Sequence, residues 1–319
     1  MIRPLPRGEK HTIQRTQIGE RSGATALDTS QTAANAEAAA IQRVLVVGAG
    51  TMGSGIAQVI AQSGIHTTVT DADSASLERG LAGTAARWER LVKSGRLSAR
   101  EVADFHSNLT PGTIADSTNA DLVIEAIVEI PEPKSALFEE LAKVAPPATI
   151  LASNTSSISI STLGRASRRP DRFLGLHFFN PVPVLPLVEI VRGIETSDHT
   201  LATCVRFVEA IGKTPIVVSD SPGFVANRLL LPMINEAIFA LQDGVAPATS
   251  IDEVMKLGMS HPMGPLALAD LIGLDICLDI LETLHRDFGD DKYRPAPMLR
   301  RMVGAGKLGR KSGHGFYEY

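Results

Sequence analysis

Three glycines in the sequence have the spacing of a phosphate-binding loop between a strand and a helix. The loop consists of Gly48, Ala49, Gly50, Thr51, Met52 and Gly53. The first glycine permits a tight turn, the second lets backbone approach a pyrophosphate, and the third lets a helix pack on a strand. Free N–H groups at the start of the helix would face the phosphates. The loop therefore predicts a dinucleotide site, and a tight turn without a ligand is the alternative.

A carboxylate follows at the end of the next predicted strand. Asp71 lies about 20 residues after the first glycine, the spacing of the group that accepts hydrogen bonds from the adenosine ribose. Residues 72–78 contain no Lys or Arg and add Asp73 and Glu78. A 2′-phosphate would meet these carboxylates, so we expect NAD and not NADP as the cofactor. A turn or helix cap is the alternative role for Asp71.

Strand and helix patterns alternate from Arg43 onward and predict a parallel sheet covered on both faces. The predicted strands are residues 44–47, 67–70, 121–124, 149–152, 173–176, 187–191 and 216–218, and the predicted helices between them include 54–63, 75–93 and 134–143. The pattern after a turn-rich hinge at 219–223 is helical, over 224–241, 250–256, 266–288 and 297–303. The spacing of Ser250 and Glu253 predicts a capping box. The predicted fold class is α/β, an N-terminal Rossmann-type doubly wound parallel sheet with an all-helical C-terminal domain.

The predicted domains are residues 41–222, which bind NAD, and residues 223–319, which are helical. Residues 1–40 lack a regular hydrophobic period and are predicted to be a disordered extension. Their arginines leave an organelle-targeting peptide, and hence the mitochondrial matrix, as an alternative to the cytoplasm. Only two cysteines are present, which indicates a reducing compartment.

Composition and charge exclude several classes of partner. A net charge of -4 gives no electrostatic reason to expect nucleic acid. No apolar run approaches the roughly 18–20 residues that span a membrane. No close cluster of His, Cys and Asp predicts a metal site. We therefore expect a globular protein that has neither nucleic acid nor a membrane as a partner and no metal site.

Longer motifs follow the glycine loop in a fixed order. They are ASNTSS at 152–157, GLHFFNPVP at 175–183, LVEI at 187–190, PGFVANR at 222–228, HPMGP at 261–265 and GRKSGHGFY at 309–317. Together they resemble the 3-hydroxyacyl-CoA dehydrogenase family, particularly its single-function 3-hydroxybutyryl-CoA dehydrogenases, over residues 42–319. The resemblance implies NAD-dependent interconversion of a 3-hydroxyacyl-CoA, of short chain, and its 3-oxoacyl counterpart.

The resemblance also implies the role of individual residues. His177 matches the family's catalytic histidine and Glu189 its partner carboxylate, while Ser156 and Asn227 match the residues that hold the substrate. Besides the glycine loop, the family's cofactor contacts match Asp71, Glu129, Lys134, Ser156, Asn180 and Lys311. Arg87 and Lys93 lie nearest to the family's coenzyme A contacts, on the helix after the second strand.

These residue types suit the oxidation of a secondary alcohol. A histidine can accept the hydroxyl proton near neutral pH, and Glu189 would hold its tautomer and stabilise the imidazolium. Ser156 and Asn227 offer neutral donors to the substrate oxygen. His177 and Glu189 come from successive predicted strands, so they can be neighbours. The alternative roles are a core histidine, a helix cap for Ser156, and capping or packing for Asn227.

Three prolines depart from the family's pattern near these residues. Pro186 stands where the family commonly has Lys, just before the strand of Glu189. Pro131 and Pro133 precede Lys134. Proline fixes φ and removes a backbone donor, so these sites raise the question whether Glu189 and Lys134 keep their places.

Two other functions stay open at this point. One is a dehydrogenase of another 3-hydroxy acid or sugar acid on the same scaffold, and the other is a non-catalytic NAD-binding protein. The resemblance further implies an acyl-CoA partner and a homodimer formed through the helical domain. Residues 224–241 support the dimer, because a helix with apolar residues on several sides must be covered from several sides.

Overall fold

The computed structural model describes residues 40–319. The predicted disordered extension over residues 1–40 therefore lies, except for its last residue, outside the described part of the chain. Over residues 40–319 no helix is both long and apolar enough to cross a membrane.

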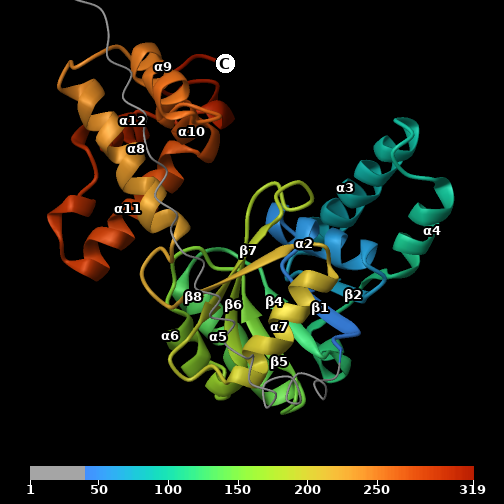
Figure 1. The fold of residues 1–319 in the computed structure, drawn as a ribbon. Helices are drawn as coiled ribbons and strands as arrows, with labels where there is room; N and C mark the ends of the chain where they lie inside the picture. Colours follow the sequence, from blue (N-terminus) through green and yellow to red (C-terminus); the bar gives the residue numbers. More distant parts are fainter. Residues whose placement is uncertain (1–39) are drawn as a thin grey trace, which may run out of the picture. The chain divides into compact units, whose positions relative to one another are not determined.

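Eight strands form one sheet in the order β3-β2-β1-β4-β5-β6-β7-β8 (Figure 1). They are β1 (Arg43–Val47), β2 (His66–Thr70), β3 (Leu109–Pro111), β4 (Leu122–Glu125), β5 (Ile150–Ser153), β6 (Phe173–Phe178), β7 (Leu187–Arg192) and β8 (Thr214–Ser219). Every neighbouring pair is parallel except β6 and β7. The predicted parallel sheet is confirmed elsewhere and wrong at this pair. Residues 179–186 are too few for the crossover that parallel neighbours require.

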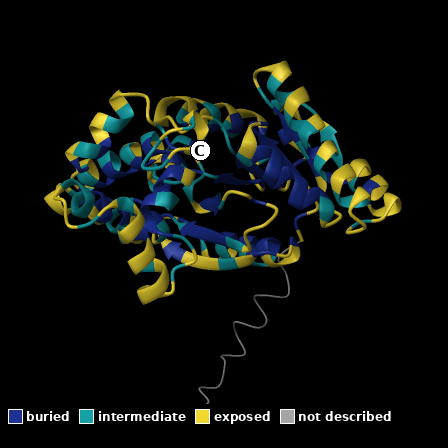
Figure 2. Cartoon of the chain, turned by 90° about the horizontal axis from the view of Figure 1, so that it is seen from above, coloured by how far each residue is buried: buried dark blue, intermediate teal, exposed yellow. Residues whose placement is uncertain are grey.

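Helices cover both faces of the sheet, as expected for parallel strands such as β1 and β4, which are apolar along most of their length. On one face lie α2 (Thr51–Gln62) and α7 (Asp198–Ala210), which pack Ile60 and Phe207 against the strands. On the other lie α5 (Pro131–Val144) and α6 (Ile160–Ala166), which contribute Phe138 and Leu163. Most of the sheet is accordingly buried (Figure 2). The doubly wound arrangement predicted from the sequence is confirmed.

Two antiparallel helices follow β2 and extend away from the sheet (Figure 1). They are α3 (Ser74–Lys93) and α4 (Ala99–Ser107). Trp88 is fully buried and joins Ala61 and Val102 in a small core of their own. Because Ala61 belongs to α2, the pair α3–α4 is attached to the sheet through α2.

The sheet domain also contains two short 3₁₀ helices, η1 (Ile114–Asn119) and η2 (Pro170–Arg172).

The remaining helices form a second domain with its own core. They are α8 (Ala226–Gln242), α9 (Ala248–Met259), α10 (Pro265–Ile272), α11 (Leu274–Phe288) and α12 (Pro297–Gly304), with η3 (Asp291–Tyr293) and η4 (Arg310–Ser312). The predicted single helix over 266–288 is wrong, because Gly273 has a φ of +107° and ends α10. The predicted capping box is also wrong. Helix α9 starts two residues before Ser250, with Pro247 as its N-cap.

Two buried carboxylates hold the last segment of the chain against this domain. Asp270 accepts hydrogen bonds from the backbone N–H groups of Phe316 and Tyr317 and from the hydroxyl of Tyr319. Asp252 accepts from the first amides of α10 and from the hydroxyl of Tyr317. Burial and the nearby carboxylates raise the pKa of Tyr317. The C-terminal segment is therefore part of the domain core.

Candidate active site

The glycine loop joins β1 to α2 at the carboxyl ends of the strands. A Cβ on Gly53 would lie 1.8 Å from the carbonyl oxygen of Gly48, whereas a Cβ on Gly50 would meet no atom within 4 Å. Gly50 is the N-cap of α2 and provides no side-chain cap. The first amides of α2 therefore have no side-chain acceptor, and open space lies beside Gly50. This arrangement suits a pyrophosphate.

Asp71 at the end of β2 reaches this loop. One of its carboxylate oxygens accepts a hydrogen bond from the N–H of Ala49 at 2.7 Å, and the other accepts from the N–H of Asp73 at 2.9 Å. The first basic side chain after β2, Arg79, forms an exposed ion pair with Asp73 at 3.4 Å. Asp71 thus lies where a ribose bound to the loop would meet a carboxylate, and Arg79 is engaged with another one.

His177 and Glu189 face each other across the antiparallel pair β6–β7. They are direct register partners, and Nδ1 of His177 lies 2.8 Å from Oε2 of Glu189. Both side chains are buried. An antiparallel ladder places such partners side by side. The strand direction that the sequence did not predict is therefore what brings the two residues into contact.

The second carboxylate oxygen of Glu189 caps helix α8. It accepts hydrogen bonds from the backbone N–H groups of Val225 and Ala226 at 3.2 and 3.0 Å, and α8 has no side-chain cap of its own. Phe224, just before these amides, has a φ of +50°, a conformation that is uncommon for a bulky residue. Its ring packs against the ring of His177 at 5.8 Å. The strained turn delivers both amides to Glu189.

Ser156 and Asn227 lie side by side although 71 residues separate them. The side-chain amide of Asn227, in the first turn of α8, donates to the backbone carbonyl of Ser156 at 3.1 Å. Ser156 in turn donates through its N–H to Glu129 at 2.8 Å. The two predicted substrate contacts therefore come together beside the His177–Glu189 pair, through the start of α8.

Lys134 is buried in the first turn of α5 between two carboxylates. Its ammonium lies 2.5 Å from Glu125 and 3.2 Å from Glu129. Pro131 and Pro133 occupy the N1 and N3 positions of α5, where a helix uses no backbone donor. These prolines fit the helix start and leave Lys134 in place. Glu125 is not among the residues predicted from the sequence.

A buried lysine holds the loop between β6 and β7. The ammonium of Lys213 donates to the carbonyl oxygens of Val182 and Leu185 at 2.6 and 2.8 Å, and burial lowers the pKa of Lys213. Pro186 precedes the ladder, and its carbonyl accepts from Thr214. Glu189 therefore keeps its register despite the proline. Asn180, in the same loop, is exposed.

Three predicted contacts lie apart from this cluster. The guanidinium of Arg87 is held within the protein by Gln58 and Thr84, and Lys93 is exposed at the end of α3. Lys311 lies in the helical domain, where its ammonium pairs with Asp275 at 2.5 Å. These three residues remain predictions based on the family alone.

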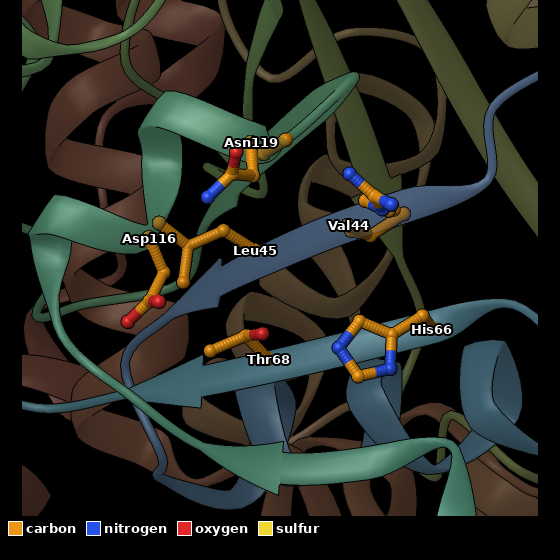
Figure 3. A pocket seen from close by; sticks show the side chains of 8 residues that line it. Val44, Leu45, His66, Thr68, Asp116 and Asn119 are labelled. Atoms are coloured by element: carbon orange, nitrogen blue, oxygen red, sulfur yellow. The ribbon is translucent and has the colours of Figure 1, made fainter.

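A hollow of about 590 Å³ lies at the opposite edge of the sheet, at the amino ends of β1 and β2. Asp116 and Asn119 face Thr68 and His66 across Leu45 (Figure 3). The β3–β4 connection carries only the short η1 there. The hollow is remote from His177 in the fold, since parallel strands present the glycine loop at their other ends.

Both domains match the profiles of one known family. The profile of the 3-hydroxyacyl-CoA dehydrogenase NAD binding domain matches residues 43–221, and that of the C-terminal domain matches residues 223–319. The chain belongs to the 3-hydroxyacyl-CoA dehydrogenase family. The family resemblance drawn from the motifs is confirmed, and so is NAD as the cofactor.

Individual members of the 3-hydroxyacyl-CoA dehydrogenase family are close to this chain. A probable 3-hydroxybutyryl-CoA dehydrogenase of Bacillus subtilis is 50% identical over 280 residues, which cover 88% of this chain and 98% of that protein. A 3-hydroxybutyryl-CoA dehydrogenase of Bradyrhizobium diazoefficiens is 47% identical, over 88% of this chain and 97% of that protein. The crystal structure of (S)-3-hydroxybutyryl-CoA dehydrogenase from Ralstonia eutropha superposes with a TM-score of 0.85 at 47% identity. The superposition covers 88% of this chain and 99% of that structure's chain.

The glycine loop of this 3-hydroxyacyl-CoA dehydrogenase permits a matched pair of substitutions. Gly53→Ala should lower the free energy of unfolding by about 1–3 kcal/mol, because the new methyl group overlaps backbone. Gly50→Ala should lower it by no more than about 1 kcal/mol, since alanine is a poorer N-cap than glycine. The same substitution should weaken NADH binding about tenfold or more, because the methyl group enters the space where backbone approaches the pyrophosphate. Thermal unfolding of the NADH-free protein and fluorescence titration with NADH measure the two effects. Equal losses of thermal stability, or equal losses of NADH affinity, in the two variants would contradict these roles of Gly50 and Gly53.

Proposed function

We propose that this chain interconverts 3-hydroxybutyryl-CoA and 3-oxobutyryl-CoA, with His177 as the general acid–base. The observation that carries the proposal is the buried contact of 2.8 Å between His177 and Glu189. A histidine whose one nitrogen faces a buried carboxylate has the other nitrogen left for proton transfer. The names of the close relatives support the short acyl chain.

The contact with Glu189 fixes the imidazole tautomer. A carboxylate accepts hydrogen bonds, so Nδ1 carries a proton and Nε2 offers its lone pair. In the oxidative direction Nε2 takes up the proton of the substrate hydroxyl, and Glu189 stabilises the imidazolium that results. In the reductive direction Nε2 returns this proton to the oxygen. When bound, NAD⁺ would accept the hydride from the carbon that bears this hydroxyl, and NADH would return it in the reductive direction.

Ser156 and Asn227 are proposed to hold the substrate oxygen. The hydroxyl of Ser156 lies 3.3 Å from Glu129, a weak contact that a substrate can replace. The side-chain amide of Asn227 already donates to the carbonyl of Ser156, so it fixes Ser156 relative to α8. A neutral donor in a site that excludes water stabilises negative charge that develops on oxygen.

A steady-state assay separates this function from its alternatives. The enzyme should reduce 3-oxobutyryl-CoA with NADH far faster than free 3-oxobutyrate, because the free acid lacks the coenzyme A contacts. A series of 3-oxoacyl-CoA chain lengths defines the acyl preference. Faster turnover of a free 3-oxo acid would indicate the other class of dehydrogenase. A chain that binds NADH and reduces none of these compounds would be a non-catalytic binding protein.

Substitution of His177 and Glu189 tests the acid–base pair. His177→Gln should lower turnover by about 100–10,000-fold and leave NADH binding unchanged. Glu189→Gln replaces an acceptor with an amide that can donate to Nδ1, which favours the wrong tautomer, so turnover should fall by a similar factor. Because the two residues act as one unit, the double variant should be far less impaired than the product of the two losses.

The exposed pair His285–Asp291, at 3.2 Å, provides the control for this cycle. His285→Gln removes the same type of contact on the surface of the helical domain and should leave turnover unchanged. A His177→Gln enzyme with near-normal turnover would refute the mechanism. Losses that multiply would assign Glu189 to capping α8 alone.

The carboxylate of Asp71 should make the enzyme prefer NADH over NADPH. A 2′-phosphate on the adenosine ribose would be repelled by Asp71, and Arg79 is paired with Asp73. Asp71→Ala should mainly raise the KM for NADH and narrow its advantage over NADPH. Steady-state kinetics with both cofactors measure this, and equal kcat/KM values for the wild-type enzyme would contradict it.

We further propose a homodimer, in the cytoplasm, that pairs through the helical domain. Leu229 of α8 and Leu257 of α9 are 68% and 82% exposed, and burying such apolar side chains favours association. Light scattering at micromolar concentration should give twice the chain mass of 33.9 kDa. Leu229→Arg with Leu257→Arg should give a monomer. The control Ile194→Arg, at an 88% exposed position of the sheet domain, should stay dimeric. A monomeric wild-type protein would refute the proposal.

A further inference from the structure

Glu125 is a fully buried carboxylate that the mechanism above does not use. It ends strand β4 and has 0% exposure. It accepts hydrogen bonds from the ammonium of Lys134 at 2.5 Å, the hydroxyl of Ser153 at 2.6 Å and the N–H of Ile127 at 2.7 Å. A buried carboxylate that loses such partners is strongly destabilised. These three groups are therefore held in fixed places around it.

Lys134 carries this constraint to Glu129. Its side chain is 1% exposed, and its ammonium contacts Glu125 and Glu129. Burial raises the pKa of Glu125. For Glu129 burial acts in the same direction but is outweighed by Lys134 and by the hydrogen bonds from Thr155 and Ser156, so its pKa is lowered. The two carboxylates thus differ in exposure and in pKa. Glu125 is fully enclosed and its pKa is raised, whereas Glu129 has 38% of its side chain exposed and its pKa is lowered.

The turn after β5 links the same two carboxylates by a second route. The hydroxyl of Ser153 donates to Glu125 and accepts from the N–H of Thr155 at 3.2 Å. Thr155 donates its hydroxyl proton to Glu129 at 2.5 Å, and the N–H of Ser156 donates to the same oxygen at 2.8 Å. Glu125, Lys134, Glu129 and residues 153–156 therefore form a closed ring of hydrogen bonds and ion pairs.

We propose that Glu125 is a positioning residue for cofactor binding, which acts through Lys134 and the 153–156 turn to hold Glu129 and Ser156 in place. The inference rests on the proposed function, which assigns Glu129, Lys134 and Ser156 to the cofactor and substrate. Glu125 has no access to either ligand, because it is enclosed by Lys134, Ser153 and the backbone of Ile127. Its effect is transmitted by the ring, and the ring places cofactor and substrate contacts in one rigid unit.

The test is NADH binding by Glu125→Gln, measured by fluorescence titration without turnover. Glutamine keeps the volume, but it loses the charge that holds Lys134 and one of the two acceptor oxygens. The Kd for NADH should rise about tenfold or more, which corresponds to about 1.4 kcal/mol. Asp270→Asn is the matched control. Asp270 is equally buried and hydrogen-bonded, but it lies in the helical domain. This variant should lose thermal stability and keep the wild-type Kd.

A double-mutant cycle with Lys134→Met distinguishes positioning from a general loss of structure. Because Glu125 acts through Lys134 and also through Ser153, the loss of NADH affinity in the double variant should be smaller than the product of the two single losses. A wild-type Kd for Glu125→Gln, or effects of the two substitutions that multiply, would overturn the proposal. If Glu125→Gln does not fold, Glu125→Asp replaces it in both measurements. This variant keeps the charge but withdraws it from Lys134, so weaker NADH binding supports the proposal and unchanged binding refutes it.

The readout also separates this inference from the proposed reaction. A wild-type protein that binds NADH but reduces no 3-oxoacyl-CoA would refute the proposed substrate. The cycle on NADH affinity would still decide the role of Glu125.

Discussion

The arrangement of this protein depends on the need to satisfy the buried carboxylate of Glu189. One oxygen contacts the imidazole of His177, and the other accepts the first amides of α8. These bonds fix β7 against β6, require the left-handed conformation of Phe224, and set the point at which the helical domain begins. Removing one partner would leave a buried charge, which typically costs about 3–5 kcal/mol. The imidazole is therefore oriented by the same bonds that attach the two domains.

The sheet topology explains why the polar groups gather where they do. The order of the strands reverses at β1, which lies between β2 and β4, and ligands of such sheets bind at this switch point. The glycine loop follows β1, Asp71 follows β2, Glu125 ends β4 and Ser156 follows β5. The antiparallel turn at β7 adds Glu189 from the opposite chain direction. The strands thus end in polar residues at the same edge of the sheet, and the buried carboxylates there, Glu125 and Glu189, each accept several hydrogen bonds.

Much of the fold could be predicted because strands buried on both faces are continuous apolar runs, and the glycine loop has a specific spacing. Other features are invisible in local sequence. A lysine in a helix, such as Lys134, is normally a surface residue, and only the packing of α5 on β4 buries it. Glu125 ends an apolar strand, and only its partners distinguish it from other residues at strand ends. Glu189 could be predicted because its motif resembles that of the family. The break at Gly273 has no periodicity to mark it, and β3 has only three residues.

The contacts of Asp270 have a consequence for synthesis of the chain on the ribosome. This carboxylate accepts hydrogen bonds from residues 46, 47 and 49 positions later. When α10 has been translated, it carries a carboxylate whose native hydrogen-bond donors have not yet been made. The helical domain therefore cannot reach its final packing until residues 316–319 have left the exit tunnel, whereas every strand of the sheet pairs with partners that lie before residue 220. The sheet domain can thus fold during translation, and the helical domain must wait.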